Sequence, residues 1–296
     1  MHLLKLTDLS FSYPSAEQAA LSGINLSIQA GECIGLLGTN GAGKTTLLSM
    51  ISRLLQPSSG SIEWQGLHSI GLVPQQLAFY SRLSVQENLT LFADLYQLRG
   101  DVRRQQMDSV LQATDLQPLL KRYAGTLSGG QQRRLNFAIG ILQPAQLYLL
   151  DEVTVGVDSR SRQRLLTYIE QLRDSGKSII YTSHYLHEIE AIAPRIILLD
   201  RGHIQCDLDT RHSPKQPQQL RLQWSESLPS SLIDFCTELG LHCELTTNSL
   251  FIAKITEQQF IKIYQFIVTH AQQPHMIQYG QPSLEQFYLN MTGGAV

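Results

Sequence analysis

The segment GTNGAGKTT, from Gly38 to Thr46, constrains the fold more than any other part of this sequence. It fits the pattern G-x-x-x-x-G-K-[ST] in full, with the apolar run CIGLL before it and leucines at helical spacing after it. A loop of this kind between a strand and a helix turns its backbone N–H groups towards phosphate oxygens, and the helix N-terminus adds positive partial charge. The segment therefore predicts a phosphate-binding loop in an α/β protein.

The residues of this loop receive predicted roles in nucleotide binding. The glycines let the backbone bend around the phosphates, Lys44 reaches the β- and γ-phosphates, and the Thr45 hydroxyl binds Mg²⁺. The predicted nucleotide-binding residues of the loop are Gly38, Thr39, Asn40, Gly41, Ala42, Gly43, Lys44, Thr45 and Thr46. A glycine turn with an incidental lysine is the alternative, and the strand–loop–helix context argues against it.

Further apolar runs alternate with helical patterns after this loop. LYLL at 147–150, SIIYTS at 178–183 and RIILL at 195–199 each suit a buried parallel strand. Strands that alternate with helices predict a parallel sheet covered on both faces. Between Phe79 and Leu142 helical stretches replace the strands, which predicts a helical subdomain inserted between strands of the sheet.

Several polar side chains follow buried strands at the predicted carboxyl edge of this sheet. LYLLDE places Asp151 and Glu152 there, where Asp151 suits Mg²⁺ coordination and Glu152 suits polarising an attacking water. His184 ends a second strand and is able to bond a γ-phosphate, while Gln75 is a candidate ligand of Mg²⁺ or of the water. An acidic pair after a strand is by itself more often a solvated turn, so the phosphate loop is what favours the functional interpretation.

The segment LSGGQQRR at 127–134 is a second anion-binding pattern. Apolar residues follow it at helical spacing, so Ser128, Gly129 and Gly130 lie at a helix N-terminus, a favoured place for an anion. The first loop already encloses the phosphates of the chain's own nucleotide. The second pattern is therefore predicted to serve a nucleotide that another subunit holds.

Together these motifs resemble those of the ATPase subunit of an ABC transporter. The resemblance rests on the Walker A segment 38–45, Gln75, LSGGQ at 127–131, LYLLDE at 147–152 and His184. It covers roughly two thirds of the chain, from about Leu3 to Leu208. It implies a P-loop ABC ATPase core with a RecA-like parallel sheet, an antiparallel β subdomain and a helical subdomain at about 79–142.

The resemblance also implies that two subunits pair head to tail around two ATP molecules. Asp158 then matches an aspartate that contacts the partner subunit. The residues that would act on the partner's ATP are Ser128, Gly129, Gly130 and Gln131.

Four further residues match functional positions of that family. Glu152 matches the catalytic glutamate, and His184 matches the switch histidine. Gln75 matches the residue that couples ATP to the membrane subunit. Tyr13 matches the aromatic residue that stacks on adenine, with a core tyrosine as its alternative.

By the same resemblance the chain is expected to bind ATP and Mg²⁺, to hydrolyse ATP and to drive a separate integral-membrane permease. It would do so as a dimer, a homodimer by expectation, that is cytoplasmic and peripheral on the inner membrane. Val153 stands where proline is usual, and TVGVD and the ending PSLEQFYLNMTGG resemble the drug, polysaccharide and lipid exporter branch. We therefore expect export rather than uptake.

Composition bears on the remaining alternatives. A formal net charge of −2 gives no general attraction to nucleic acid, and no apolar run reaches the length of a membrane span. The start lacks a signal-peptide core, and the four cysteines lack metal-ligand spacing. A soluble ABC ATPase that acts on a ribosome, on DNA or in cofactor assembly is the alternative. A nucleotide kinase would share only the first loop.

From His212 the linker-like segment HSPKQPQQ opens a second predicted domain, 212–296, after a first domain of 1–211. Its patterns run in the order βαββαβ, which matches a small ferredoxin-like α+β sheet, and SLEQFYLNM predicts a last helix. No catalytic constellation is present in this part of the sequence. A regulatory ligand site, an extended dimer contact and a passive appendage all stay open.

Overall fold

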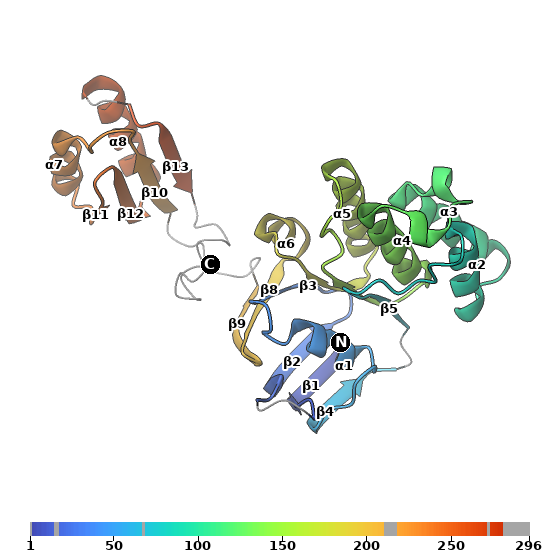
Figure 1. The fold of residues 1–296 in the computed structure, drawn as a ribbon. Coiled ribbons are helices and arrows are strands. Elements are labelled where there is room, and N and C mark those ends of the chain that lie inside the picture. The colour runs from blue at the N-terminus through green and yellow to red at the C-terminus, as the bar shows by residue number, and fades with distance from the viewer. Residues whose placement is uncertain (1, 15–17, 67–68, 210–217, 271–272, 281–296) are drawn as a thin grey trace. The chain divides into compact units, whose positions relative to one another are not determined.

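Figure 1 shows the computed structural model, which describes residues 2–14, 18–66, 69–209, 218–270 and 273–280. The chain divides into two compact units, Met1–Arg211 and His212–Val296, and each has its own sheets and its own hydrophobic core. In the described ranges, no helix has both the length and the apolar character that are needed to cross a bilayer.

A six-stranded sheet with the strand order β5-β6-β7-β3-β8-β9 is the centre of the first unit. Neighbouring strands are parallel, except that β9 runs antiparallel to β8. Every residue of β3, β6 and β7 is buried, as expected for parallel strands covered on both faces. The strands are β3 (Cys33–Leu37), β5 (Ile70–Val73), β6 (Leu147–Asp151), β7 (Ser178–Thr182), β8 (Arg195–Asp200) and β9 (His203–Asp209).

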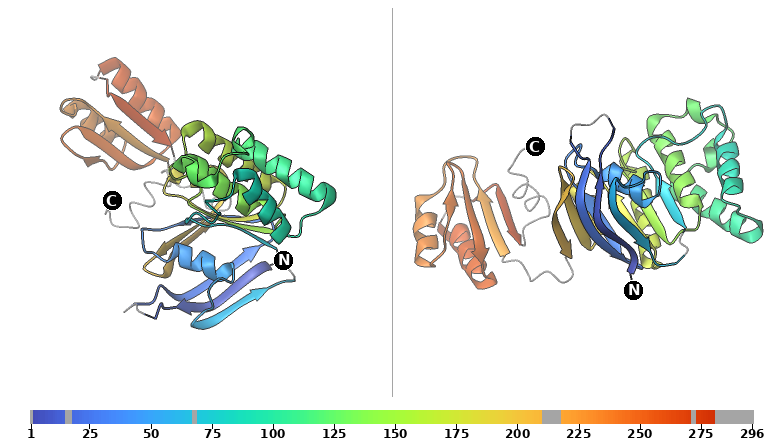
Figure 2. Two further views of the ribbon diagram at one scale, coloured as in Figure 1. Left: turned by 45° about the vertical axis from the view of Figure 1, so that its right-hand side comes forward. Right: turned by 90° about the horizontal axis from the view of Figure 1, so that it is seen from below.

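A three-stranded antiparallel sheet, with the order β2-β1-β4, faces one side of the parallel sheet. Helix α1 (Lys44–Ile51) lies between the two sheets, and one core cluster joins its residues to those of both (Figure 2). The antiparallel strands are β1 (His2–Phe11), β2 (Leu21–Gln29) and β4 (Ser59–Trp64). The predicted α/β fold, a parallel sheet with an added antiparallel subdomain, is thus confirmed.

Helices cover the opposite side of the parallel sheet. Helices α4, α5 and α6 pack on it or on one another, and α2 and α3 pack on α4. The Ser84 side chain and Glu87 form a reciprocal capping box that begins α2. The helices are α2 (Val85–Leu95), α3 (Gly100–Thr114), α4 (Gly129–Leu142), α5 (Ser159–Asp174) and α6 (Leu186–Ile192), with 3₁₀ turns at Gln117–Leu119 and Ala124–Thr126.

In its described residues, the second unit is a four-stranded antiparallel sheet with the order β11-β12-β10-β13 and two helices. Leu220, Leu222 and Trp224 are buried in its core. Its elements follow the βαββαβ order that the sequence predicts, and the predicted helix SLEQFYLNM lies outside the described residues. They are β10 (Gln218–Gln223), α7 (Ser230–Glu238), β11 (Glu244–Leu245), β12 (Ser249–Ile255), α8 (Glu257–His270) and β13 (Met276–Gly280).

The predicted strand LHCELTT is reduced to the two residues of β11. The left-handed Gly240 ends α7, and the Leu241 N–H donates back to the Cys236 carbonyl, so the chain here closes the helix instead of extending.

Helix α4 approaches β5 so closely that two glycines are required at the contact. A Cβ at Gly140 would lie 2.4 Å from Val73 Cγ2 and 2.5 Å from the Leu72 carbonyl oxygen. A Cβ at Gly71 would lie 2.5 Å from Tyr148 Cδ1 and 2.9 Å from the Gly140 carbonyl oxygen. These two glycines therefore set the distance between the helix and the sheet.

Gly140→Ala is expected to lower the free energy of unfolding by about 1–3 kcal/mol, because the added methyl group overpacks the contact. This loss should exceed the gain in helix propensity, which is about 1 kcal/mol. Urea denaturation measures the change. Gln171→Ala at an exposed position of α5 is the control and should stay within about 0.5 kcal/mol of the wild type. A Gly140→Ala protein as stable as the wild type would contradict the contact.

Candidate functional site

The predicted phosphate loop lies at the carboxyl end of β3 and leads directly into α1. Gly43 caps α1 with a φ of 105°, and a Cβ there would lie 2.5 Å from the Ala20 carbonyl oxygen. A Cβ at Gly38 would lie 2.2 Å from the Leu199 carbonyl oxygen. Both positions therefore require glycine, for backbone conformation at Gly43 and for space at both.

The Lys44 side chain curls back over this loop. Its Nζ donates to the carbonyl oxygens of Gly38 at 2.8 Å and Thr39 at 3.1 Å, and the residue is only 7% exposed. Burial lowers the pKa of Lys44, and the nearby carboxylates of Glu152 and Asp151 act in the opposite direction. The ammonium group is thus held inside the loop, where a phosphate chain would meet it.

Asp151 is buried between two hydroxyl groups at the end of β6. Its Oδ2 accepts a hydrogen bond from Thr45 Oγ1 at 2.8 Å, and its Oδ1 accepts one from Thr182 Oγ1 at 2.7 Å. Carboxylate and hydroxyl oxygens are the ligands that Mg²⁺ prefers, and few protein ligands suffice for it. The donor set of Asp151 and Thr45 therefore fits the predicted Mg²⁺ site.

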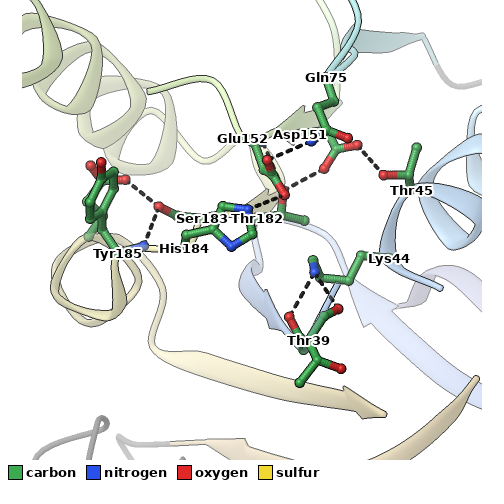
Figure 3. Close-up of polar contacts among 12 residues, drawn as sticks. Thr39, Lys44, Thr45, Gln75, Asp151, Glu152, Thr182, Ser183, His184 and Tyr185 are labelled. Atoms are coloured by element: carbon green, nitrogen blue, oxygen red, sulfur yellow. Dashed lines mark hydrogen bonds and ion pairs between the residues drawn. The ribbon is translucent and has the colours of Figure 1, made fainter. Parts of the chain in front are cut away.

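Glu152 contacts both of the other predicted catalytic residues. Gln75 Nε2 donates to its Oε2 at 2.8 Å, and His184 Nε2 lies 2.9 Å from its Oε1 (Figure 3). A carboxylate only accepts hydrogen bonds, so the proton of His184 must be on Nε2. The structure thus brings Gln75, Glu152 and His184 together, and their catalytic roles stay predictions.

Glu152 has an unfavourable backbone conformation, and from it the carboxylate reaches Gln75 and His184. Its φ is 50°, in the left-handed region, which is unfavourable by roughly 1–2 kcal/mol for a residue with a side chain. Its N–H donates to both the Thr182 hydroxyl at 2.9 Å and the Thr182 carbonyl oxygen at 3.2 Å. These two bonds to β7 hold the unfavourable conformation in place.

The segment around Gln75 is attached to α4 by two residues that the sequence did not single out. Asn136 Oδ1 accepts from the Ala78 N–H at 2.7 Å, and Asn136 Nδ2 donates to the Pro74 carbonyl at 2.9 Å. Arg133 Nη1 donates to the Gln75 carbonyl at 2.5 Å. Asn136 is 1% exposed, and a single amide within the otherwise apolar run 135–142 was the signal that could have identified it.

Tyr13 stands at the edge of this site. Its hydroxyl lies 3.2 Å from Thr46 Oγ1, and the Phe11 ring packs edge-on against it. The side chain is 42% exposed, so Tyr13 is not a core tyrosine. Stacking on adenine stays a prediction.

The residues predicted to act in trans form a local helix cap. Ser128 Oγ accepts from the Gln131 N–H, and Gln131 Oε1 accepts from the Ser128 N–H at 3.0 Å, which is a capping box at the start of α4. A Cβ at Gly129 would meet open space, whereas one at Gly130 would lie 3.0 Å from the Gly156 carbonyl oxygen. Among the described residues, these four form no hydrogen bond or ion pair with the loop 38–46.

Asp158 likewise has a local partner. Its Oδ1 accepts from the Ser161 N–H at 2.9 Å and caps α5, and this bond lowers the pKa of the carboxyl group. Its predicted contact with a partner subunit stays a prediction.

The chain is similar to known proteins in sequence and in fold. Residues 21–155 match the family described as "ABC transporter". The chain is 31% identical to the linearmycin resistance ATP-binding protein LnrL of Bacillus subtilis over 94% of both chains. It is 36% identical to the probable multidrug ABC transporter ATP-binding protein YbhF of Escherichia coli over 68% of this chain, but it spans only 36% of YbhF.

Among solved structures, the dimeric ATP-binding cassette MJ0796 in a post-hydrolysis state with ADP and Pi is similar, with a TM-score of 0.65 and 26% identity. The match covers 70% of this chain and 99% of that one.

Lys44→Met is expected to raise the free energy of unfolding when no nucleotide is added, because burial makes the charged form of Lys44 unfavourable. Added Mg-ATP should then no longer raise the melting temperature, whereas it should raise that of the wild type. Thermal and urea denaturation with and without Mg-ATP measure both effects. A Lys44→Met protein that is less stable than the wild type, or still stabilised by Mg-ATP, would contradict this prediction.

Proposed function

The chain belongs to the ABC transporter family of ATP-binding proteins, and on that premise we propose that it is the ATP-hydrolysing subunit of an exporter. The observation that carries this proposal is the arrangement around Glu152. Its carboxylate is bonded on one oxygen by Gln75 and on the other by His184. The preceding Asp151 is bonded to Thr45, which follows the loop lysine.

Each of these groups has a proposed task in hydrolysis. The loop N–H groups and Lys44 bind the phosphates of ATP, and Thr45, Asp151 and Gln75 hold Mg²⁺. An Mg²⁺ ion held by these residues would neutralise negative charge on the phosphates. Glu152 accepts the proton of the water whose oxygen attacks the γ-phosphorus, while ADP departs with the electrons of the broken P–O bond.

His184 and Gln75 keep that carboxylate in place. His184 donates from Nε2 to Glu152 and so holds one of the two carboxylate oxygens. Gln75 meets Glu152 from the segment that α4 anchors.

We propose further that two subunits close over ATP, with the first turn of α4 in one facing the phosphates bound in the other. Support comes from the free space at Gly129, from the helix N-terminus with its positive partial charge, and from the dimeric structure of the MJ0796 cassette. The capping box fixes the backbone of this turn before any partner arrives.

The partner and the cargo are proposed from the relatives. LnrL is named for linearmycin resistance and YbhF for probable multidrug transport, so we propose a membrane permease that exports a drug-like compound. The chain would then act at the cytoplasmic face of the membrane through that permease. Residues 1–211 would be the ATPase domain and 212–296 an accessory domain.

Glu152→Gln is expected to lower kcat for ATP hydrolysis by about 10²–10⁴-fold, because the amide is not a base. Binding of ATP should be retained, since the amide keeps the size and the hydrogen-bonding reach of the carboxylate. With Mg-ATP this variant should therefore accumulate as a dimer, which light scattering detects, while phosphate release measures hydrolysis. Hydrolysis at the wild-type rate would remove Glu152 from its proposed role.

A matched pair of substitutions tests the trans contact. Ser128→Arg in the Glu152→Gln background should keep the protein monomeric with Mg-ATP, because the new side chain fills the space at the first turn of α4. Ser84→Arg in the same background is the control, because Ser84 forms the same kind of capping box on α2. It loses a comparable cap of about 1 kcal/mol but should still dimerise. A dimer in both variants would reject the trans contact.

The permease is tested by capture with tagged Glu152→Gln protein and Mg-ATP from detergent-solubilised membranes of the native cell. We expect one integral-membrane protein in stoichiometric amount, and its loss when Lys44→Met is used as bait. Recovery of a soluble partner alone would favour an ABC ATPase that acts outside a membrane complex.

A further inference from the structure

A buried carboxylate outside the site described above links two of its segments. Glu188 on α6 is fully buried, at 0% exposure. Its Oε2 accepts hydrogen bonds from three hydroxyl groups, at 2.5 Å from Tyr181, 2.6 Å from Ser183 and 2.9 Å from Thr154. Three donors on one oxygen describe an ionised carboxylate, because a protonated one would have to donate as well.

The donors remain protonated in this setting. Burial raises the pKa of Tyr181 far above its usual value, and the nearby Glu188 raises it further, so the phenol keeps its proton and donates. An ionised carboxylate without hydrogen bonds would be strongly unfavourable at this depth. The four side chains therefore stabilise one another as a single network.

The second oxygen of Glu188 faces a cation. Its Oε1 lies 3.7 Å from Arg162 Nε, an ion pair that is longer than a hydrogen bond, and neither atom has a hydrogen-bond partner among the described residues. The Arg162 guanidinium also reaches the Val157 carbonyl at 3.4 Å and lies 4.5 Å from the centre of the Tyr185 ring.

These contacts join the segment 154–158, which follows the predicted catalytic residue Glu152, to the segment 183–185, which contains the predicted catalytic residue His184. Thr154 follows Glu152 by two residues and belongs to the segment 154–158, which ends at Asp158. Ser183 precedes His184, and its hydroxyl also accepts the Tyr185 N–H at 3.0 Å (Figure 3). Glu188 and Arg162 contact both the segment 154–158 and the segment 183–185.

We propose that Glu188 is a positioning residue for ATP hydrolysis. Its carboxylate, together with Arg162, fixes the segment 154–158 against the segment 183–185, and so keeps His184 in contact with Glu152. It acts through Ser183 and Thr154 and touches neither substrate nor metal. A displacement of the segment 154–158, which carries the predicted subunit-contact residue Asp158, is thereby passed on to His184. This inference rests on the proposed ATPase function.

Glu188→Gln tests the charge with little change in shape. The amide oxygen is able to accept the three hydroxyl bonds, but the amide N–H₂ then faces Arg162 Nε, donor against donor. We expect kcat for ATP hydrolysis to fall by about tenfold while KM for ATP stays within about twofold. Glu190→Gln, at an exposed position of the same helix, is the control and should leave kcat unchanged. A Glu188→Gln protein with wild-type kcat would overturn the proposal.

A double-mutant cycle tests the linkage itself. Thr154→Val and Ser183→Ala should have non-additive effects on kcat in the wild-type background, because both act through Glu188. In the Glu188→Gln background their effects should become additive. Additive effects in the wild-type background, or equal non-additivity in both, would mean that Glu188 does not link the two segments.

Hydrogen–deuterium exchange separates this inference from the proposed function. Glu188→Gln should accelerate amide exchange in 154–158 and in 183–187 together, with no change in the strands β3 and β6, and Glu190→Gln should change neither segment. Acceleration in only one segment, or in neither, overturns the linkage whatever the ATPase rate. If the wild type hydrolyses no ATP but Glu188→Gln accelerates amide exchange in both segments, the proposed function is rejected and the linkage between the segments is confirmed.

Discussion

The site depends on the Thr182 hydroxyl more than on any other single group. It donates its one proton to Asp151 and accepts the N–H of Glu152, so it fixes both acidic residues at once. Asp151 is 2% exposed and needs such partners, because a buried carboxylate without them is strongly unfavourable. Its other oxygen binds Thr45 on α1. Three side chains thus join β7, β6 and the helix that follows the phosphate loop.

Much of this arrangement could be predicted from the sequence, because its signals are local. The glycine-rich loop, the apolar strands and the acidic pair after LYLL are contiguous patterns, and the carboxyl ends of parallel strands meet at one edge. The partners of these residues could not be predicted in the same way. Asp151 meets Thr182 through the register of β6 and β7, and Asn136 meets Pro74 across 62 positions of sequence. Such pairs follow from the packing of elements, which no short pattern encodes.

Several residues with a predicted functional role also cap a helix of their own chain. The sequence alone could not separate these two roles. Ser128 and Gln131 form a capping box, and Asp158 caps α5, so each would suit its position even without a partner subunit. Gly129 is different, because a side chain there would meet only open space and its left-handed freedom is not used. No contact among the described residues therefore requires glycine at this position, and the proposed approach of a partner subunit would account for it.

Helix α4 connects that outward turn to Glu152 with little freedom to move. One end of α4 is the capped turn at Gly129, where a side chain would meet open space. Near the other end, Gly140 packs so closely on β5 that a Cβ would collide with it, so sliding cannot bring a residue with a side chain to this contact. Between them, Arg133 and Asn136 hold the segment that carries Gln75, and Gln75 bonds Glu152. These bonds make the segment of Gln75 follow α4, so a tilt of α4 about the glycine contact would shift Gln75 relative to Glu152.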